Sequence, residues 1–313
     1  PNLTSPANSA TNQPPQTVID WSTVSGNSGY IYEVDVSAGF NSGQLLTGTT
    51  SNSSFTLSNL LFGTTYYWRV KTMSSIDTSV WSAVRSFTTL DQVNNVSPSP
   101  GTTGLSPQTV IDWATVSGTQ WYIYEVDTTP SFNSPEYQFG NTTNSSFTLS
   151  NLLFGKTYYW RIASKHATDT SGWGQTWTFS TLDWVNNSSP FNGATNQPPQ
   201  IFLDWGTVTG NQWYIYQIDT TPTFNSPYLL AGNSGANQSQ VTVPNLLFGK
   251  TYYWRAAVKH ALDTSEWGPV WTFSTLDGVS NVSPANGSGG IHPQRTLDWG
   301  TVTGNQWYIY QLD

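Results

Sequence analysis

Glutamates at two equivalent positions are the first candidates for acid–base catalysis, which needs carboxyl groups held beside a substrate. Glu33 and Glu125 each lie in the wording Tyr-Ile-Tyr-Glu-Val-Asp. The corresponding positions further along the chain hold Gln217 and Gln311, which keep the shape of the side chain and lose its charge. A general base could not survive that exchange. We therefore expect no catalytic residue and no enzymatic activity.

The three histidines, His166, His260 and His292, are the candidates for a transition-metal site. His166 and His260 occupy equivalent positions, where an earlier stretch of sequence has Ser74. One histidine in each such stretch cannot build a mononuclear metal site, which takes several ligands. We expect the histidines to lie at the surface, and we expect neither a metal nor another cofactor.

Aspartates recur at two kinds of position. Strand alternation would point one set outward, beside a buried tryptophan: Asp20, Asp112, Asp204 and Asp298. The other set ends successive stretches of similar sequence, where calcium could bridge neighbours: Asp91, Asp183 and Asp277. Calcium needs several oxygen ligands, and only one aspartate stands at each of these points. Both sets are therefore interpreted as solvated or turn residues.

The composition excludes several classes of partner. Only 9% of the 313 residues are charged, and the formal net charge is −8. Nucleic-acid binding depends on clustered lysines and arginines, which are absent, so we expect no nucleic-acid partner. No apolar stretch approaches the ~18 residues that a membrane helix needs, so we expect no membrane insertion. There is no cysteine, and hence neither a disulfide nor a thiolate metal site.

Internal repetition sets the expected architecture. The dipeptide Asp-Trp recurs at residues 20–21, 112–113, 204–205 and 298–299, at spacings of 92, 92 and 94. The wording Leu-Leu-Phe-Gly-x-Thr-Tyr-Tyr-Trp-Arg occurs three times with similar spacing. The predicted domains are three complete repeats, 1–91, 92–183 and 184–277, followed by the N-terminal part of a fourth, 278–313.

The sequence is expected to be a processed or internal segment of a longer chain. It begins at Pro1, with neither a methionine nor a signal peptide. At its other end, Asp313 aligns with Asp127 and Asp219, at the end of a predicted strand. A chain that ended there would leave strand edges open and Trp299 uncovered, which is an aggregation hazard.

Short alternating runs separated by turn residues predict β-strands at intervals of roughly ten residues, as in a β-sandwich. In the second repeat the predicted strands are Thr109–Trp113, Tyr122–Asp127, Ser146–Leu149, Tyr158–Ala163 and Thr176–Thr181. No segment has a convincing 3.6-residue apolar period, so we expect almost no helix. The predicted fold class is all-β, a tandem array of immunoglobulin-like sandwiches.

The segment Leu152–Tyr158, followed by Trp160-Arg161-Ile162, resembles the turn-and-strand signature of fibronectin type III domains. In that family a leucine precedes a corner tyrosine by six residues. The resemblance covers every complete repeat. It implies that the corner tyrosines bond to backbone upstream, and these are Tyr66, Tyr158 and Tyr252. The sequence departs from the family by having phenylalanine where proline is frequent, at Phe62, Phe154 and Phe248.

A finer resemblance is carried by Asp127–Ser134, Asp-Thr-Thr-Pro-Ser-Phe-Asn-Ser, and by its partner Asp219–Ser226. This wording is similar to fibronectin-like repeats of giant surface adhesins of gliding Bacteroidota, which are exported by the type IX pathway. The resemblance implies an extracellular location at a bacterial cell surface. It also implies O-glycosylation at Thr128 and Thr220, whereas the first repeat has Val36 at that position; an ordinary turn is the alternative.

Tryptophans are predicted in three settings. Trp21, Trp68 and their equivalents lie on the inward side of their strands and belong to the core. Arg161 is expected to stack between Trp173 and Trp177 in a cation–π ladder. Trp121, Trp213 and Trp307 are expected on the outer face of their sheet, where the first repeat has Gly29, because Trp121 shares its side with two carboxylates, Glu125 and Asp127. These three are the candidate contact residues; the alternative is that each ring covers adjacent backbone.

The leading hypothesis is a non-enzymatic stalk or filament segment of a large repetitive adhesin, serving gliding motility and surface attachment. Near-identical repeats joined by short linkers (Asp91–Ser97 and Asp183–Ser189) predict a semi-rigid rod. Partners would be surface glycans or a polymeric substratum, and the outer-membrane motility and secretion machinery. The alternative is a set of accessory or glycan-binding modules of a secreted polysaccharide-degrading enzyme. Fold alone does not choose between them.

Overall fold

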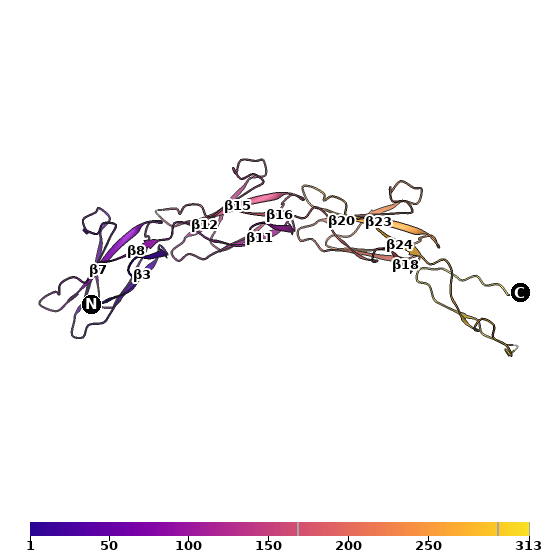
Figure 1. Cartoon of the computed structure of the whole chain (residues 1–313), viewed down its shortest axis with the longest axis horizontal. Helices are drawn as coiled ribbons and strands as arrows, with labels where there is room; N and C mark the ends of the chain where they lie inside the picture. Colours follow the sequence, from indigo (N-terminus) through magenta and orange to yellow (C-terminus); the bar gives the residue numbers. More distant parts are fainter. Residues whose placement is uncertain (168, 293, 313) are drawn as a thin grey trace. The chain divides into compact units, whose positions relative to one another are not determined.

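The computed structural model describes residues 1–167, 169–292 and 294–312, so Asp313 lies outside the described residues. In that part of the chain all regular secondary structure is β-strand, as predicted (Figure 1). The strands of the first repeat are β1 Leu3–Ser5, β2 Ala10–Gln13, β3 Thr17–Trp21, β4 Gly29–Asp35, β5 Leu46–Thr50, β6 Ser54–Leu57, β7 Thr65–Met73 and β8 Arg85–Thr89. Those of the second are β9 Asn95–Ser97, β10 Thr102–Leu105, β11 Thr109–Trp113, β12 Trp121–Asp127, β13 Gln138–Thr142, β14 Ser146–Leu149, β15 Thr157–Lys165 and β16 Trp177–Thr181. Those of the third are β17 Asn187–Ser189, β18 Ala194–Gln197, β19 Ile201–Trp205, β20 Trp213–Asp219, β21 Leu230–Asn233, β22 Gln240–Val243, β23 Thr251–Lys259 and β24 Trp271–Thr275, and β25 Asn281–Ser283 and β26 Asp298–Trp299 follow.

The chain divides into two compact units. The first comprises Pro1–Thr102, Val110–Thr148 and Thr157–Phe179, and the second comprises Thr103–Thr109, Leu149–Lys156 and Ser180–Asp313. The first repeat thus lies wholly in the first unit, and the third lies wholly in the second. The predicted boundaries after residues 91, 183 and 277 remain predictions.

In the first unit, the first repeat folds as two sheets. One has the strand order β1-β3-β6 and the other β2-β8-β7-β4-β5. Neighbouring strands are antiparallel except β2 and β8, which run parallel. Trp21 on β3 and Trp68 on β7 are 2% and 0% exposed and share one hydrophobic core, so both sheets bury the faces that the alternation assigned to the interior.

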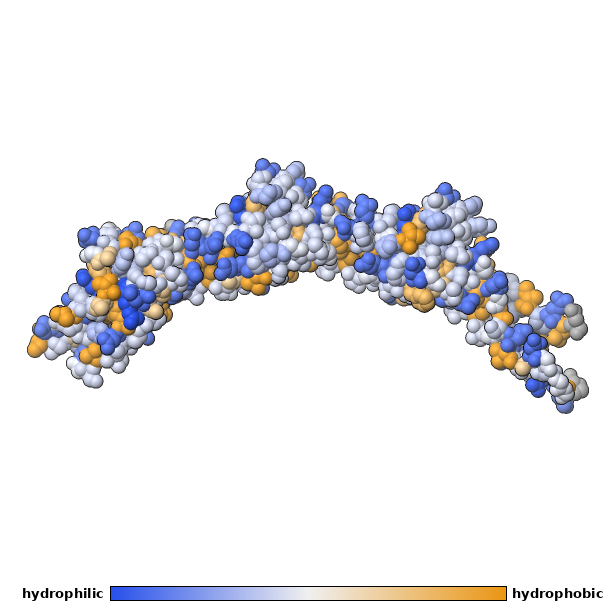
Figure 2. Space-filling model, in the orientation of Figure 1, coloured by the Kyte–Doolittle hydropathy of each residue, from blue (hydrophilic) through white to orange (hydrophobic). Residues whose placement is uncertain are grey.

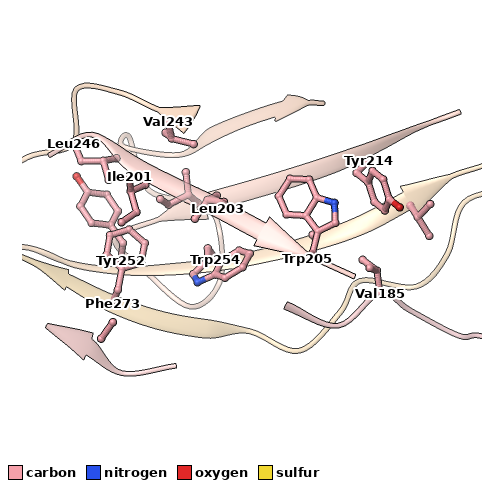
Figure 3. Close-up of a cluster of buried hydrophobic side chains, with 14 of the residues drawn as sticks. Val185, Ile201, Leu203, Trp205, Tyr214, Val243, Leu246, Tyr252, Trp254 and Phe273 are labelled. Atoms are coloured by element: carbon pink, nitrogen blue, oxygen red, sulfur yellow. The ribbon is translucent and has the colours of Figure 1, made fainter. Parts of the chain in front are cut away.

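In the second unit, the third repeat has the same arrangement. Its sheets have the orders β17-β19-β22 and β18-β24-β23-β20-β21, with β18 and β24 parallel. Figure 3 shows the core, in which Trp254 lies near Tyr252 and Phe273, and Trp205 lies near Tyr214. This topology, in which the second strand of the repeat runs parallel to the last strand of an otherwise antiparallel sandwich, confirms the predicted all-β class of tandem fibronectin type III-like sandwiches.

All five strands predicted in the second repeat are present. β11 and β14 have the predicted bounds. β12 begins one residue earlier, at Trp121, and β16 begins one residue later, at Trp177. β15 is longer than predicted by one residue at its start and two at its end. The apolar alternation therefore located every strand that contributes large side chains to the interior.

The prediction missed β9, β10 and β13. β9 and β17 lie in the segments predicted as linkers and pair with β11 and β19, so the predictions that Asp91–Ser97 and Asp183–Ser189 are wholly linkers are wrong. β13 pairs with β12 and places Gly140 opposite Tyr124. A Cβ on Gly140 would lie 2.6 Å from the ring carbon Cζ of Tyr124, so this edge position requires glycine to let the ring lie across it.

Two of the predicted tyrosine corners, Tyr66 and Tyr252, form where the resemblance placed them. The hydroxyl of Tyr66 accepts a hydrogen bond from the backbone N–H of Leu61 at 3.0 Å, and that of Tyr252 accepts one from Leu247 at 2.9 Å. Burial of each ring raises the pKa of the Tyr66 and Tyr252 hydroxyls, while these bonds act in the opposite direction. Each hydroxyl thereby fixes the turn that precedes its strand.

Candidate contact surface

The outer face of β12 carries Trp121, as alternation predicted. Tyr122 and Tyr124 point inward and are buried, whereas Trp121, Ile123 and Glu125 are half-buried. At the equivalent position on β20, Trp213 is 38% exposed; Trp307 is 71% exposed but lies on no strand, so its predicted place on the outer face of a sheet is not found. On the face drawn in Figure 2, hydrophobic residues form small groups among hydrophilic ones. Whether these indoles bind a partner remains a prediction.

The two outer-face tryptophans that lie on strands, Trp121 and Trp213, are each opposite a lysine. Trp121 is paired with Lys165 on β15, and Trp213 is paired with Lys259 on β23. In the first repeat the corresponding pair is Gly29 and Met73. Because directly opposite residues share a face, the second and third repeats each present an indole beside a cationic side chain.

Arg161 on β15 lies between two aromatic rings on this same outer face. Its guanidinium carbon is 4.2 Å from the centroid of Phe132 and 4.7 Å from that of Trp173. Glu125 completes the group through an ion pair of 2.6 Å. The prediction of stacking on Trp173 is confirmed. The prediction that Trp177 forms the other side is wrong, because Phe132 occupies that place.

Trp177 faces the other side of the sheet. It packs edge-on against buried Trp160, with ring centroids 6.0 Å apart. In the third repeat the corresponding residues, Trp254 and Trp271, are directly opposite each other in the ladder. Opposite residues share a face, so a tryptophan paired with a core tryptophan cannot reach an arginine on the outer surface.

Tyr137 is a second hydrogen-bond partner of the Glu125 carboxylate. Its hydroxyl donates a hydrogen bond of 2.8 Å to Glu125 Oε1. Partial burial, followed by this bond and the charge of Glu125, raises the pKa of Tyr137 to about 12. Gln217, which replaces Glu125 in the third repeat, still accepts two hydrogen bonds from Arg255. The group therefore links β12 or its equivalent to the neighbouring strand across the sheet surface in both repeats.

The prediction that Asp127 lies on the exposed side of β12 with Trp121 and Glu125 is wrong, because Asp127 is 0% exposed. It accepts hydrogen bonds from the backbone and hydroxyl of Ser134, the backbone of Thr128 and the hydroxyl of Thr129. Burial alone would raise the pKa of this carboxyl, but these hydrogen bonds hold it below its usual range. Asp35 and Asp219 are equally buried, and their pKa values are lowered by the equivalent bonds.

Thr128 and Thr220, the predicted glycosylation positions, begin the loops that cover these aspartates. Both are half-buried. The hydroxyl of Thr128 lies 3.0 Å from that of Ser134, and the hydroxyl of Thr220 lies 3.1 Å from that of Ser226. Their modification remains a prediction.

The prediction of surface histidines is right for His292, which is exposed, and wrong for the other two. His166 and His260 are 0% and 1% exposed. Each lies in what we call a histidine loop, the segment that carries His166 and Asp169 in the second repeat and His260 and Asp263 in the third. Both are covered by residues of the preceding repeat, so their burial does not follow from the sequence of one repeat.

In the first unit, the histidine loop of the second repeat covers the turn that contains Phe62. The imidazole of His166 stacks on the Phe62 ring with centroids 5.0 Å apart, and its Nε2 lies 2.9 Å from the carbonyl oxygen of Leu60. The backbone N–H of Phe62 donates to Asp169 Oδ2 at 2.9 Å. Gly172 N–H donates to the carbonyl of Asp91 at 2.9 Å.

In the second unit, the histidine loop of the third repeat makes the corresponding contact with Phe154. The rings of Phe154 and His260 meet edge-on at 5.9 Å, and Phe154 N–H donates to Asp263 Oδ2 at 2.8 Å. His260 Nδ1 lies 3.3 Å from Asp263 Oδ1. Phe62 and Phe154 therefore each serve as a contact between repeats. The sequence signal for this contact was that a phenylalanine at one repeat position, Phe62 or Phe154, is followed in the next repeat by a histidine, His166 or His260.

The remaining candidates form no reactive group. Asp91, Asp183 and Asp277 are exposed, Asp20, Asp112 and Asp204 are half-buried, and Asp298 is exposed. Among the described residues, no group of three or more histidine, aspartate or glutamate side chains could hold a metal ion. The described residues also include no helix long and apolar enough to span a membrane.

No protein-family model and no curated protein match the sequence. Among solved structures, the chain is similar to the FN1–FN3 domains of chicken CNTN1, with 15% sequence identity and a TM-score of 0.25. The alignment covers 88% of this chain and 97% of that chain. At this identity and TM-score the likeness assigns no function.

Proposed function

We propose that the chain is a non-enzymatic stalk or filament segment of a large repetitive adhesin at the surface of a bacterial cell, with a part in surface attachment and gliding motility. The observation that carries the proposal is the recurrence of an outward-facing tryptophan beside a lysine, at Trp121 and Trp213, on sandwiches that are otherwise structural. The partners would be surface glycans or a polymeric substratum, with the outer-membrane motility and secretion machinery at one end of the parent chain.

An indole beside a lysine is suited to a sugar ring. The aromatic face offers a flat apolar platform, and the ammonium group can donate to hydroxyl oxygens at its edge. Each single contact of this kind is weak. Repetition along one chain raises the effective concentration of the next contact, so several weak sites can hold a polymer firmly.

Attachment of the full chain to polysaccharide-coated surfaces tests this proposal with Trp121→Ala and Trp213→Ala. We expect the melting temperature to change little and attachment to fall, because both rings lie on the outer face. The matched control is Trp113→Ala, a core residue whose loss costs about 3–5 kcal/mol. Attachment that persists in the double variant, or a melting temperature that drops as in the control, would contradict the proposal.

We also propose that Thr128 and Thr220 carry O-linked glycans in the native organism. Support comes from the short Asp-Thr-Thr wording and from its place where a strand passes into a loop. The first repeat is a natural control, since Val36 has no hydroxyl at that position. Glycopeptide mapping of the native protein checks this, and two unmodified threonines would reject it.

The rival function, an accessory module of a secreted polysaccharide-degrading enzyme, would use the same tryptophans. The two are separated by the parent reading frame. Dozens of further repeats would support the adhesin, whereas a glycosidase domain in the same frame would support the rival.

A further inference from the structure

The chain contains three copies of the turn that the histidine loops contact, which we call the Phe-Gly turn: residues 60–63, 152–155 and 246–249. Two are covered. Phe62 and Phe154 are 8% and 6% exposed, and each backbone N–H donates to an aspartate of the following repeat. In the third turn Phe248 is 49% exposed and Leu247 is 40% exposed. No acceptor for the N–H of Phe248 is found within the described part of the chain.

A second contact accompanies each covered turn. A Cβ placed on Gly118 would lie 2.9 Å from the Cβ of Gln16 in the preceding repeat, and one on Gly210 would lie 2.8 Å from that of Gln108. These glycines have φ of +89° and +84° and approach the glutamines closely because they lack a side chain. We call the turn that contains this glycine (Gly118 or Gly210) the glycine turn. The glycine turn and the histidine loop of the same repeat thus both contact the preceding repeat, once in the first unit and once in the second.

At the third repeat only one of these two contacts is made. Gly304 has φ of +84°, and a Cβ on it would lie 2.5 Å from the Cβ of Gln200. The glycine turn of residues 301–304 therefore lies against the third repeat as the equivalent turns lie against the first and second. The sequence has no further Lys-His-Ala wording after His260, so the chain's own histidine loops are both already engaged.

We propose that the third Phe-Gly turn, residues 246–249, is a docking surface for the histidine loop of a further repeat. The partner is defined by its chemistry: an imidazole that packs on the Phe248 ring and a carboxylate, three residues later, that accepts the Phe248 N–H. The first repeat has the aspartate, Asp77, but Ser74 in place of the histidine, so another copy of this chain is a poor partner. The inference holds whether or not the chain is part of a stalk.

Amide hydrogen exchange of the 313-residue chain, read at single-residue resolution, gives the first test. We expect the amides of Phe62 and Phe154 to exchange at least about ten-fold more slowly than that of Phe248, because only the first two are hydrogen-bonded. Asp169→Ala should remove the protection of Phe62 and leave that of Phe154. The control is Asp77→Ala, since Asp77 and Asp169 both accept the N–H of the following threonine and only Asp169 reaches another repeat. Equal protection at Phe248 in the unaltered chain would overturn the proposal.

The second test lengthens the chain after Asp313 with a copy of residues 220–277, which supplies a histidine loop to the fourth repeat. We expect the Phe248 amide to become as protected as that of Phe154. A matched chain, whose added histidine and aspartate are replaced by serine and alanine, should leave Phe248 unprotected. Protection that survives this replacement, or that never develops although the core amides of the added repeat are protected, would overturn the proposal.

Discussion

Three aspartates, Asp35, Asp127 and Asp219, are fully buried and charged at neutral pH because their loops supply the hydrogen bonds that water would otherwise provide. The donors for Asp127 come from the segment that follows it, chiefly Ser134. The carboxylate thereby holds its loop closed, and the same loop brings Phe132 onto Arg161. The buried carboxylate of Asp127 thus helps to position Phe132 against Arg161.

Acid should weaken this arrangement. The folded-state pKa of Asp127 is lowered, so its contribution to the free energy of unfolding is present above the ordinary carboxyl pKa of about 3.9 and is lost as pH falls through the folded value. We expect Asp127→Asn to melt below the unaltered chain at pH 7, with the difference shrinking below about pH 4. Thermal unfolding across this pH range checks it, with Asp112→Asn as the control. A difference independent of pH would contradict the assignment.

At the residue scale, alternation was enough to place Trp121 outside and Trp113 inside. It failed for Asp127, because the donors that make burial of the carboxylate tolerable lie in a loop without regular structure. It failed for His166 and His260 because the residues that cover them are about a hundred positions earlier in the chain. Alternation along a strand predicts which face of its own sheet a residue lies on, and it does not predict contacts with loops or with other repeats.

At the scale of elements, the edge strands β5, β13 and β21 share a central glycine. Gly48, Gly140 and Gly232 each lie opposite a tyrosine whose ring extends across the strand: Tyr32, Tyr124 and Tyr216. The apolar group that covers the edge strand is therefore the tyrosine ring of the neighbouring strand. This explains why the edge strand's own sequence lacks alternation and escaped prediction.

Gly140→Ala should destabilise the second repeat by about 1–3 kcal/mol, the usual effect of overpacking, because the new Cβ would overlap the buried ring of Tyr124. Thermal or denaturant unfolding measures the change. Gly43→Ala is the control, since a Cβ there meets nothing within 4 Å and the residue's φ is not positive. Equal stability of the two variants would show that the ring moves aside freely.

Of the elements, the sequence predicted those that bury large side chains. β9, β10 and β13 were missed because their residues, Asn-Val-Ser, Thr-Thr-Gly-Leu and Gln-Phe-Gly-Asn-Thr, form strands through pairing with a neighbour rather than through an apolar face of their own. The outer ladder was half predicted. The place of Arg161 follows from its strand and that of Trp173 from its nearness in sequence to the last strand, whereas Phe132 comes from a loop that Asp127 holds closed.

At the scale of the whole molecule, each complete repeat has a buried tryptophan pair of its own. The stability of such an array is approximately a sum of repeat stabilities and nearest-neighbour terms. A change in one core should therefore be felt strongly in its own repeat, weakly in the adjacent one and not beyond.

Trp68→Ala checks this. The buried ring is 0% exposed, so its removal should cost the first repeat about 3–5 kcal/mol. Hydrogen exchange of the variant should be faster throughout β3, β4 and β7 and unchanged in β19, β20 and β23. A uniform increase across all three repeats would show that the chain unfolds as one cooperative body.

The identical wording of β3 and β11, Thr-Val-Ile-Asp-Trp, and of β6 and β14, Ser-Phe-Thr-Leu, bears on how the chain reaches its native state. During refolding β3 meets two chemically equal partners, 32 residues away in β6 and 124 residues away in β14. The difference in loop-closure entropy favours the near one by only about 1.2 kcal/mol. Strand exchange between the first two repeats is the expected trap, while β19 and β22, whose sequences differ, stand apart from it. Synthesis from the N-terminus avoids the trap, because β6 emerges and pairs before its rival exists.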